Sequence, residues 1–472
     1  MDVMVERVGN LVVVRPWIPA LEETLTCTRR VREWHGYDFV TEKMFSVPPA
    51  ANGQPQDGLV YGGLFGRVYD KLRALGHTVT VVDKQRPLPE PDYSCLPKLR
   101  QNQPELLAAV IASSRGLIEA PTGLGKSFVI KVLIGLFPTL TILLVSRAQA
   151  VCNKLYQDLR EAYPKLPLGR LFGTKQELPE GAKVVVATTR SMWKLEPAEV
   201  DMLIFDEAHN AAAPEVSGRL AAFNRAWMFG FSATPLGRDD GTDLITEAFF
   251  GPVIHRIDWQ EAEKAGNIAH IVVKVVHVKL PEIDIADELA RMRTAYWLNG
   301  PRNAALVQFA ERVLPADAQV LYYVDRVEHG LALRRLLPKV PFVHAGIGTE
   351  RWADFKRMQL VTDADVDELM HPNVSELTAA FKEGVLRRAI ATSVWKEGVD
   401  FPDLHALVRF DGGRGLINSV QLAGRLTRIG SDLQKREAVL IDALDDFGRV
   451  FKKRSLERLN VYRQKGWTIE RF

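Results

Sequence analysis

The sequence has few cysteines, no long apolar run and almost no net charge. Only 3 of its 472 residues are cysteine, and Cys27, Cys95 and Cys152 lie far apart. This spacing excludes a disulfide framework and a cysteine-based zinc site, and it favours a reducing compartment. No apolar run is long enough to span a membrane, and residues 1–20 carry acids and prolines where a signal peptide would not. We therefore expect a cytoplasmic protein, bacterial or in a phage-infected host, without a membrane partner.

The charge balance excludes a chain that is basic overall. The formal net charge is +3, so any surface for nucleic acid must be local. Hydrophobic residues make up 47% of the chain and charged residues 25%, as in ordinary globular proteins. At 472 residues the chain is too long for one core, and its length predicts two to four domains.

One short stretch, residues 120–127, combines small residues with a lysine and a serine. Residues 116–119 before it predict a buried strand, and residues 128–137 after it predict a helix. Two glycines in such a loop let backbone N–H groups approach an anion, and the helix N-terminus adds its dipole. The pattern predicts a nucleotide phosphate cradle, although Ala120 stands where the usual pattern begins with glycine. A glycine turn that happens to precede Lys-Ser is the alternative.

In this cradle Lys126 is expected to reach the outer phosphates and the Ser127 hydroxyl to hold Mg²⁺. The predicted ligands are therefore ATP and Mg²⁺. The loop residues assigned to ATP are Pro121, Thr122, Gly123, Leu124, Gly125, Lys126 and Ser127.

Residues 1–90 predict a small α+β accessory domain. A β-branched strand (10–15), a glycine-rich turn (61–66), a helix (67–75) and a further strand (77–82) follow one another. The segment 28–39 interleaves basic and aromatic residues. It is either a surface for nucleic acid or an amphipathic segment that packs its aromatics inward. Prolines then mark residues 91–98 as a stiff linker.

Apolar strands alternate with helices from residue 99 to 256, at 116–119, 141–145, 183–187, 202–205 and 227–231. Continuous apolar strands predict a parallel sheet covered on both faces, with ligand loops at the carboxyl ends of the strands. Asp206 and Glu207 directly follow one such strand. Asp206 can hold the Mg²⁺ that Ser127 touches, and Glu207 can orient and deprotonate an attacking water. His209 is placed to couple this loop to the hydroxyls of Ser232 and Thr234.

These motifs resemble the superfamily 2 helicases and translocases with a DEAH signature, over roughly residues 99–445. Within that superfamily the chain looks most like the UvsW-type phage helicases and the XPB-like and RadD-like branch. The resemblance implies that Arg100 and Gln103 lie in the adenine-reading element. It also implies contacts with the nucleic-acid backbone from Arg147, Thr188 and Thr189, where each residue alone could equally be a strand-end turn.

A second alternating pattern over residues 284–447 has no phosphate loop, and residues 257–283 are expected to connect it to the first. The resemblance implies that Arg425 and Arg428, spaced by three on one helical side, are arginine fingers, with Gln421 nearby. It places Gly398 and Asp400 near the nucleotide, and Thr392 and Ser393 near the nucleic-acid strand. Residues 348–375 are an acid-rich insertion, and residues 448–472 a basic tail with a helical patch at Lys452, Lys453, Arg454 and Arg458.

We therefore expect an α/β protein with two tandem RecA-like lobes, each a parallel sheet flanked by helices, and a small α+β N-terminal accessory domain. The expected function is an ATP-dependent DNA helicase or translocase acting on branched, forked or partly single-stranded DNA. Three alternatives stay open: an RNA helicase, the motor subunit of a restriction or defence complex, and an ATP-gated clamp that does not translocate.

Overall fold

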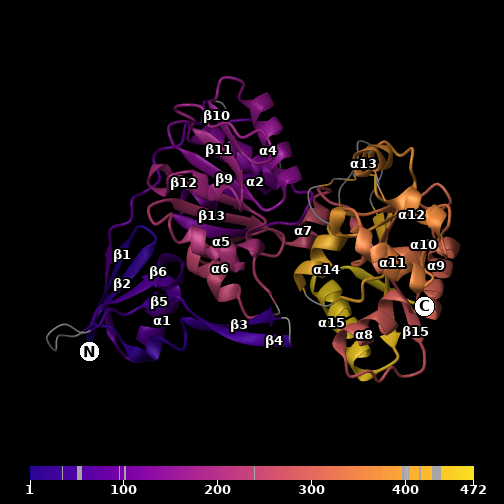
Figure 1. Cartoon of the computed structure of the whole chain (residues 1–472). Coiled ribbons are helices and arrows are strands. Elements are labelled where there is room, and N and C mark those ends of the chain that lie inside the picture. The colour runs from indigo at the N-terminus through magenta and orange to yellow at the C-terminus, as the bar shows by residue number, and fades with distance from the viewer. Residues whose placement is uncertain are drawn as a thin grey trace. The chain divides into compact units, whose positions relative to one another are not determined.

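A computed structural model covers residues 1–472 and describes most of them (Figure 1). Outside the description lie residues 34–35, 50–55, 95, 100–101, 239, 371–372, 396–398, 400, 402, 414–415 and 428–436, and the side chains of 30, 32–33, 36–37 and 416–418. The chain forms two compact units. The first comprises Met1–Pro121 and Gly125–Ile257, and the second comprises Asp258–Phe472 with the loop residues Thr122–Leu124. The domain boundaries given above stay a prediction.

The first unit begins with a mixed five-stranded sheet, in the order β5-β6-β2-β1-β7. Its strands are β1 (Asp2–Val8), β2 (Leu11–Arg15), β5 (Phe45–Ser46), β6 (Gly58–Tyr61) and β7 (Thr78–Asp83). Helix α1 (Phe65–Ala74) buries Val68 and Leu72, one turn apart, as its apolar spacing predicts. The expected small α+β domain is confirmed.

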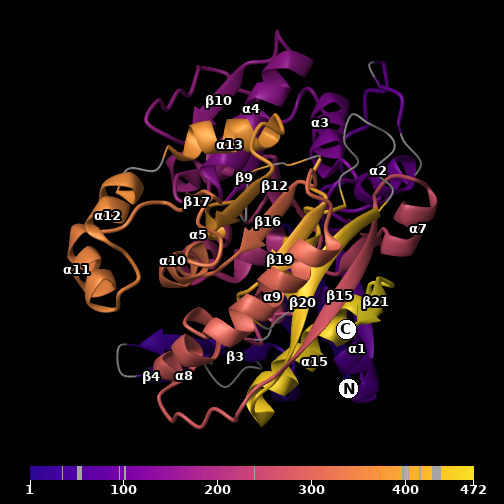
Figure 2. The same ribbon diagram turned by 90° about the vertical axis from the view of Figure 1, so that its right-hand side faces the viewer.

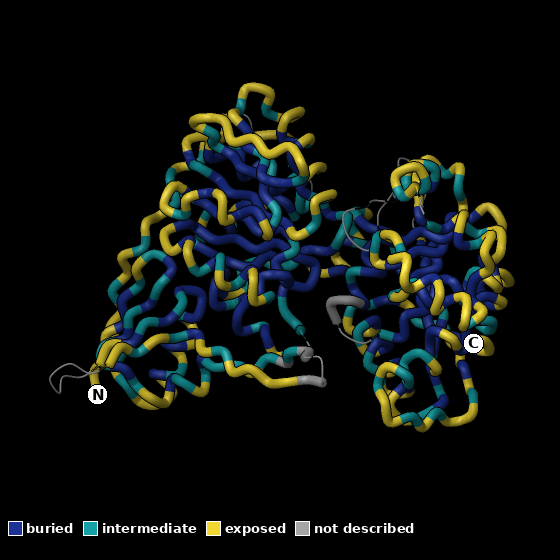
Figure 3. The backbone as a smooth tube through the Cα atoms, in the orientation of Figure 1, coloured by how far each residue is buried: buried dark blue, intermediate teal, exposed yellow. Residues whose placement is uncertain are grey.

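A separate antiparallel hairpin, β3 (Thr26–Glu33) and β4 (Gly36–Lys43), lies between β2 and β5 in the chain and forms its own two-stranded sheet. It extends from the N-terminal sheet as a two-stranded ribbon (Figure 1). Residues 38–43 of β4 are largely exposed (Figure 3), and Phe39 exposes 71% of its surface. The hypothesis that segment 28–39 packs its aromatics inward is therefore wrong for Phe39.

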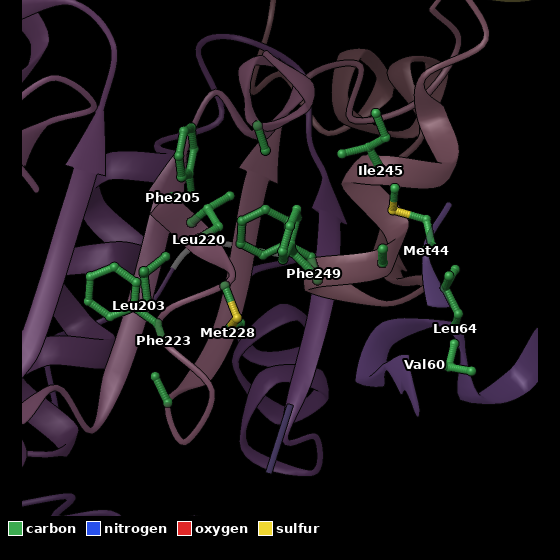
Figure 4. Close-up of a cluster of buried hydrophobic side chains, with 14 of the residues drawn as sticks. Met44, Val60, Leu64, Leu203, Phe205, Leu220, Phe223, Met228, Ile245 and Phe249 are labelled. Carbon is green, nitrogen blue, oxygen red and sulfur yellow. The ribbon is translucent and has the colours of Figure 1, made fainter. Parts of the chain in front are cut away.

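The N-terminal sheet and the first parallel sheet share one hydrophobic core (Figure 4). Met44, Val60 and Leu64 belong to the same buried cluster as Phe205 and Phe249. A buried guanidinium reinforces this contact. Arg115 donates to the Gly9 carbonyl at 2.8 Å and to Asn10 Oδ1 at 2.5 Å. The accessory domain is therefore fixed to the first sheet.

The first parallel sheet has seven strands among the described residues, in the order β10-β11-β9-β12-β13-β8-β14. Its strands are β8 (Arg115–Glu119), β9 (Ile142–Ser146), β10 (Leu168–Leu171), β11 (Val184–Thr188), β12 (Met202–Asp206), β13 (Trp227–Ser232) and β14 (Val253–Arg256). Its helices are α2 (Gln103–Ile111), α3 (Lys126–Leu136), α4 (Gln149–Ala162), α5 (Pro214–Leu220) and α6 (Asp243–Phe250). All strand pairs are parallel, and β9, β12 and β13 are buried throughout, which confirms the expectation from continuous apolar runs.

The second unit repeats this plan, with the described strand order β17-β18-β16-β19-β20-β15-β21 (Figure 2). Its strands are β15 (His270–Lys279), β16 (Val320–Tyr323), β17 (Phe342–Val343), β18 (Arg388–Ala391), β19 (Ala406–Arg409), β20 (Glu437–Asp446) and β21 (Thr468–Arg471). Its helices are α7 (Trp259–Lys264), α8 (Glu288–Met292), α9 (Gly300–Val313), α10 (Val327–Arg334), α11 (Thr349–Arg357), α12 (Asp363–Leu369), α13 (Val374–Lys382), α14 (Leu416–Ala423) and α15 (Arg449–Gln464). Two parallel α/β lobes and a small N-terminal domain match the expected fold class.

Two segments expected to lie outside the second lobe belong to its sheet. Strand β15, expected in the connection, pairs with β20 along its whole length. Strand β21, expected in the tail, pairs with β15, and α15 precedes it. Arg458 does not join a basic surface patch, because its side chain is fully buried against Asp442. Within the described residues, no helix combines the length and apolarity needed to cross a bilayer.

Candidate active site

The loop after β8 has the backbone geometry of an anion cradle. Gly123 and Gly125 adopt φ angles of 95° and 80°, in the left-handed region that glycine tolerates best. Helix α3 begins at Lys126, whose Nζ donates to the Ala120 carbonyl at 3.1 Å. A Cβ added at Gly125 would lie 3.4 Å from Gln103 Nε2, so the predicted adenine-reading glutamine lies against the loop.

Two carboxylates lie at the carboxyl end of β12, where Asp206 is the last residue of the strand and Glu207 follows it. Strand β12 pairs with β13, and β13 pairs with β8, so the three predicted loops follow adjacent strands. Asp206 is buried, and Glu207 adopts φ 59° and ψ 55°. A left-handed conformation is uncommon for a residue other than glycine, and such strain concentrates at functional sites.

His209, Ser232 and Glu207 form one hydrogen-bonded cluster. His209 Nδ1 lies 3.0 Å from Ser232 Oγ and 3.3 Å from Glu207 Oε2. Ser232 Oγ donates to Glu207 at 3.3 Å and accepts from the Thr234 backbone N–H at 3.1 Å. The predicted coupling residues are therefore brought together. The Thr234 hydroxyl is buried without a hydrogen-bond partner among the described residues.

The two carboxylates differ in electrostatic environment. Burial and the adjacent Glu207 charge raise the pKa of Asp206 to about 7, against the opposing charge of Lys126. Burial also acts to raise the pKa of Glu207, but the hydrogen bond from His209 and the charge of Lys126 outweigh it and lower that pKa. Glu207 is therefore ionised at neutral pH and can accept a hydrogen bond from water, while Asp206 is held where a cation would stabilise its charge.

The donor set fits Mg²⁺ held mainly by phosphate and water. Within the described part of the chain, no group of three or more His, Cys, Asp or Glu residues could hold a metal. Mg²⁺ commonly takes only one or two carboxylates and completes its shell with waters and substrate phosphates. The buried Asp206 carboxylate and the Ser127 hydroxyl at the start of α3 suit that arrangement.

Two residues that support this cluster were not predicted from the sequence. Asn210 donates from its side chain to the Glu207 carbonyl at 3.2 Å and accepts from Arg147 at 3.3 Å. Arg238 donates to the His209 carbonyl at 2.8 Å. The short spacing of Asn210 from His209 could have flagged it, whereas nothing in the local pattern around Arg238 indicates its partner.

The predicted nucleic-acid residues of the first unit lie at neighbouring strand ends. Arg147 follows β9, and Thr188 ends β11. The Thr189 N–H donates to the Ser146 carbonyl at 3.1 Å, and the Thr188 and Ser191 hydroxyls lie 3.0 Å apart. These groups therefore share one edge with the phosphate loop, as expected of parallel strands.

In the second unit, Arg425 is buried and donates to the Val399 carbonyl at 2.5 Å. It does not lie on a helix as expected, because α14 ends at Ala423 and residues 424–427 form a turn. Gln421 is on α14 and partly buried, Thr392 is buried, and Ser393 is exposed. Four predicted residues lie outside the described ones: Arg100, Gly398, Asp400 and Arg428.

Comparison with known proteins gives a matching family model and several relatives. A family model described as "Type III restriction enzyme, res subunit" matches residues 96–237. The DNA 3'-5' translocase XPB2 of Sulfurisphaera tokodaii is 23% identical over 73% of this chain and 81% of its own length. A putative helicase of a Sulfolobus islandicus filamentous virus is also 23% identical, over 73% of this chain but 63% of its own length. These matches show that the chain is similar to the superfamily 2 helicases and translocases.

A solved structure shares the two-lobe fold. The structure of a fragment of a putative HsdR subunit of a type I restriction enzyme from Vibrio vulnificus aligns with 78% of this chain and 66% of its own length. Its TM-score is 0.56 at 17% identity, which supports the two-lobe fold. The crystal structure of T4 UvsW aligns with 100% of this chain and 99% of its own, at 15% identity and a TM-score of 0.42. The family model and the XPB2 relative confirm the expected resemblance to the superfamily 2 helicases.

Proposed function

We propose that this chain is an ATP-dependent DNA helicase or translocase acting on branched, forked or partly single-stranded DNA. Its role would be unwinding, annealing or branch migration in replication, recombination or repair. The observation that carries the proposal is the left-handed Glu207, hydrogen-bonded to His209 and Ser232 beside the buried Asp206. The XPB2 relative, a DNA 3'-5' translocase, supports DNA. A relative from African swine fever virus is a putative ATP-dependent RNA helicase, which keeps RNA as the alternative.

The residues divide the chemistry as follows. Backbone N–H groups of the 120–127 loop and the Lys126 ammonium would hold the phosphates. Asp206 and Ser127 would hold Mg²⁺, which would supply positive charge to the transferring phosphoryl group. Glu207 positions the attacking water and accepts its proton. The resemblance to the superfamily 2 helicases implies that Arg425 and Arg428 would supply guanidiniums to the γ-phosphate, with Gln421 nearby.

Ser232 and Thr234 connect this chemistry to nucleic acid. Ser232 contacts both Glu207 and His209, so a change at the carboxylate reaches the loop that follows β13. Arg147, Thr188, Thr189, Thr392 and Ser393 would bind the strand, because hydroxyls and guanidiniums suit phosphate contacts. The grip would change with nucleotide state, which converts hydrolysis into stepping.

The test is ATP turnover measured with no nucleic acid, single-stranded DNA, forked DNA and RNA, followed by strand displacement on the forked DNA. We expect the largest stimulation with forked or single-stranded DNA, and loss of turnover in Lys126→Ala. Stimulation by RNA alone would replace DNA with RNA as the substrate. ATP binding without turnover on any of these would favour the clamp, and turnover without strand displacement would favour a translocase such as a restriction motor.

A further inference from the structure

An exposed tryptophan lies at the same sheet edge as the phosphate loop, in the first unit. Trp193 belongs to a 3-10 turn, Met192–Lys194, that follows β11 after the loop 189–191. It exposes 62% of its surface, although its neighbours Met192 and Leu195 are buried. An exposed indole on an ordered turn leaves a flat apolar face available to a partner.

The turn that carries Trp193 is anchored on both sides. The Ser191 N–H donates to the Thr188 carbonyl at 2.9 Å, and the Lys194 N–H donates to the Ser191 carbonyl at 3.0 Å. Arg219 donates to the Thr189 carbonyl. Because the backbone of this turn is already ordered, less conformational entropy is lost when a partner stacks on its tryptophan.

Two basic residues lie close to Trp193 in the chain. The Lys194 ammonium lies 5.9 Å from the Trp193 ring centroid and also donates to Gln176. Arg190, on the loop between β11 and the turn, is exposed. An exposed aromatic ring with one cation nearby, and a second exposed basic residue three positions earlier in the chain, suits a base flanked by backbone phosphates, which is how proteins bind single strands without reading sequence. A protein partner with an apolar surface would not need the two cations.

The position of the ring agrees with a strand-binding role. In the sheet order, β11 is separated from β8 by β9, β12 and β13. Four strand spacings of about 4.8 Å place the two strand ends roughly 19 Å apart. Nucleic acid bound at Trp193 would therefore lie beside the nucleotide site at the same edge without competing for it.

We propose that Arg190, Trp193 and Lys194, here called the Trp193 platform, bind single-stranded DNA by stacking one base on the indole and pairing the cations with adjacent phosphates. This proposal rests on the proposed function, since it names a contact of the same motor with its substrate. It adds a stacking contact to the backbone contacts expected from Arg147, Thr188 and Thr189.

The test compares variants of the full chain for binding to fluorescein-labelled oligo(dT) by anisotropy. Trp193→Ala should weaken binding about 5- to 100-fold, which corresponds to the loss of one base–aromatic stack. Trp193→Phe should restore most of the affinity because it keeps a ring. Arg190→Gln and Lys194→Gln should each lower the salt dependence of binding by about one counterion.

The matched control is Tyr93→Ala, which removes another exposed aromatic ring, 56% exposed, from the same unit. It should leave oligo(dT) affinity unchanged. Trp193→Ala should keep the thermal unfolding midpoint, because the side chain it removes is largely exposed.

The outcomes separate the two proposals. If the wild-type chain binds oligo(dT) and Trp193→Ala binds it equally well, the platform is overturned while the motor stands. An equal loss of affinity for a blunt duplex would also overturn it, because a paired base cannot stack on the ring. If the wild-type chain neither binds oligo(dT) nor is stimulated by it while oligo(U) does both, the DNA assignment itself fails.

Discussion

The two parallel sheets have the same plan but treat buried charge in opposite ways. At the carboxyl edge of the first sheet, the buried Asp206 and the left-handed Glu207 have Lys126 as their nearby cation, and the Thr234 hydroxyl is unpartnered among the described residues. That edge retains strain and electrostatic cost. A bound phosphate and cation would relieve them.

In the second unit three buried arginines are paired with buried aspartates. Arg409 binds Asp411 through two contacts, at 2.6 and 3.1 Å. Arg458 binds Asp442 through two contacts of 2.9 Å, and Arg302 binds Asp445 at 2.7 Å. A tyrosine and two serines complete the network, namely Tyr462, Ser419 and Ser455.

The difference teaches which buried polar groups are available for chemistry. A charge that is already compensated holds its own lobe together, and a charge that is not compensated can respond to a ligand. The Arg409 network also reaches α14 through Ser419, just before the turn that carries Arg425. The second unit thus uses its pairs to hold the segment that presents the predicted arginine finger.

The largest expected effect is on hydrolysis at the uncompensated edge. Glu207→Gln should lower kcat for ATP by about 10²- to 10⁴-fold, because a neutral amide cannot accept the water proton. Binding of a fluorescent ATP analogue should be kept. The matched control is the exposed Glu196→Gln, which should turn over as the wild type does. Unchanged turnover in Glu207→Gln would show that another group is the base.

The next effect is on stability in the paired network. Arg458→Met should lower the free energy of unfolding of the second unit by about 3–5 kcal/mol, because it leaves the buried Asp442 charge without its partner. Urea unfolding, followed by hydrogen exchange in peptides from residues 258–472, measures this loss. Lys453→Met on the same helix is the control, since that side chain is 75% exposed. A loss below about 1 kcal/mol would contradict the comparison.

A smaller effect should appear as acid sensitivity of the second unit. Burial lowers the pKa of His344 to about 4, and its Nδ1 accepts from the Gly346 N–H at 3.1 Å. Because the unfolded chain has a pKa near 6.5, it binds more protons than the folded chain between about pH 4 and 6.5. His344 therefore contributes stability above about pH 6.5 that is lost as the pH falls towards 4, up to about 3 kcal/mol.

The measurement is the pH dependence of unfolding in the second unit. His344→Asn should flatten it, because the amide keeps an acceptor for Gly346 and does not titrate in this range. An unchanged slope between about pH 4.5 and 6.5 would show that other groups dominate the pH dependence of unfolding.

The sequence predicted the parallel sheets and the loops that follow their strands, because continuous apolar runs and small residues are local signals. It did not predict the partners of Arg458. A basic residue on a helix with Lys452 and Lys453 has the pattern of a solvated face, and Asp442 lies on a strand 16 residues earlier. Nor did it predict that β15 and β21 are neighbours, since that pairing joins segments about 200 residues apart.

Within the site, residue types and strand ends were enough to bring Glu207, His209 and Ser232 together. The conformation of Glu207 was not predictable, because a left-handed glutamate depends on the surrounding packing and not on local preference. The helix expected through Arg425 ends earlier than predicted, at Ala423. Glycine at 424 weakens a helix, and the N–H groups of 425 and 426 bond to carbonyls three residues back.

The smallest effect gives the sharpest contrast between the two units. Thr234→Val removes a buried hydroxyl that has no partner among the described residues, so it should raise the free energy of unfolding by about 1 kcal/mol. Ser419→Ala removes a hydroxyl that accepts from Arg409 at 2.9 Å, so it should lower that free energy by about 1–3 kcal/mol.

The Thr234→Val and Ser419→Ala variants also separate an effect on stability from an effect on function. Thr234→Val should become more stable and yet lose stimulation of ATP turnover by DNA, because the hydroxyl is retained for coupling at a cost in stability. Ser419→Ala should lose stability and keep its stimulation at temperatures where it is folded. If Thr234→Val were destabilised, the hydroxyl would be satisfied in the folded protein, and the contrast between an uncompensated edge and a compensated network would fail at its most sensitive point.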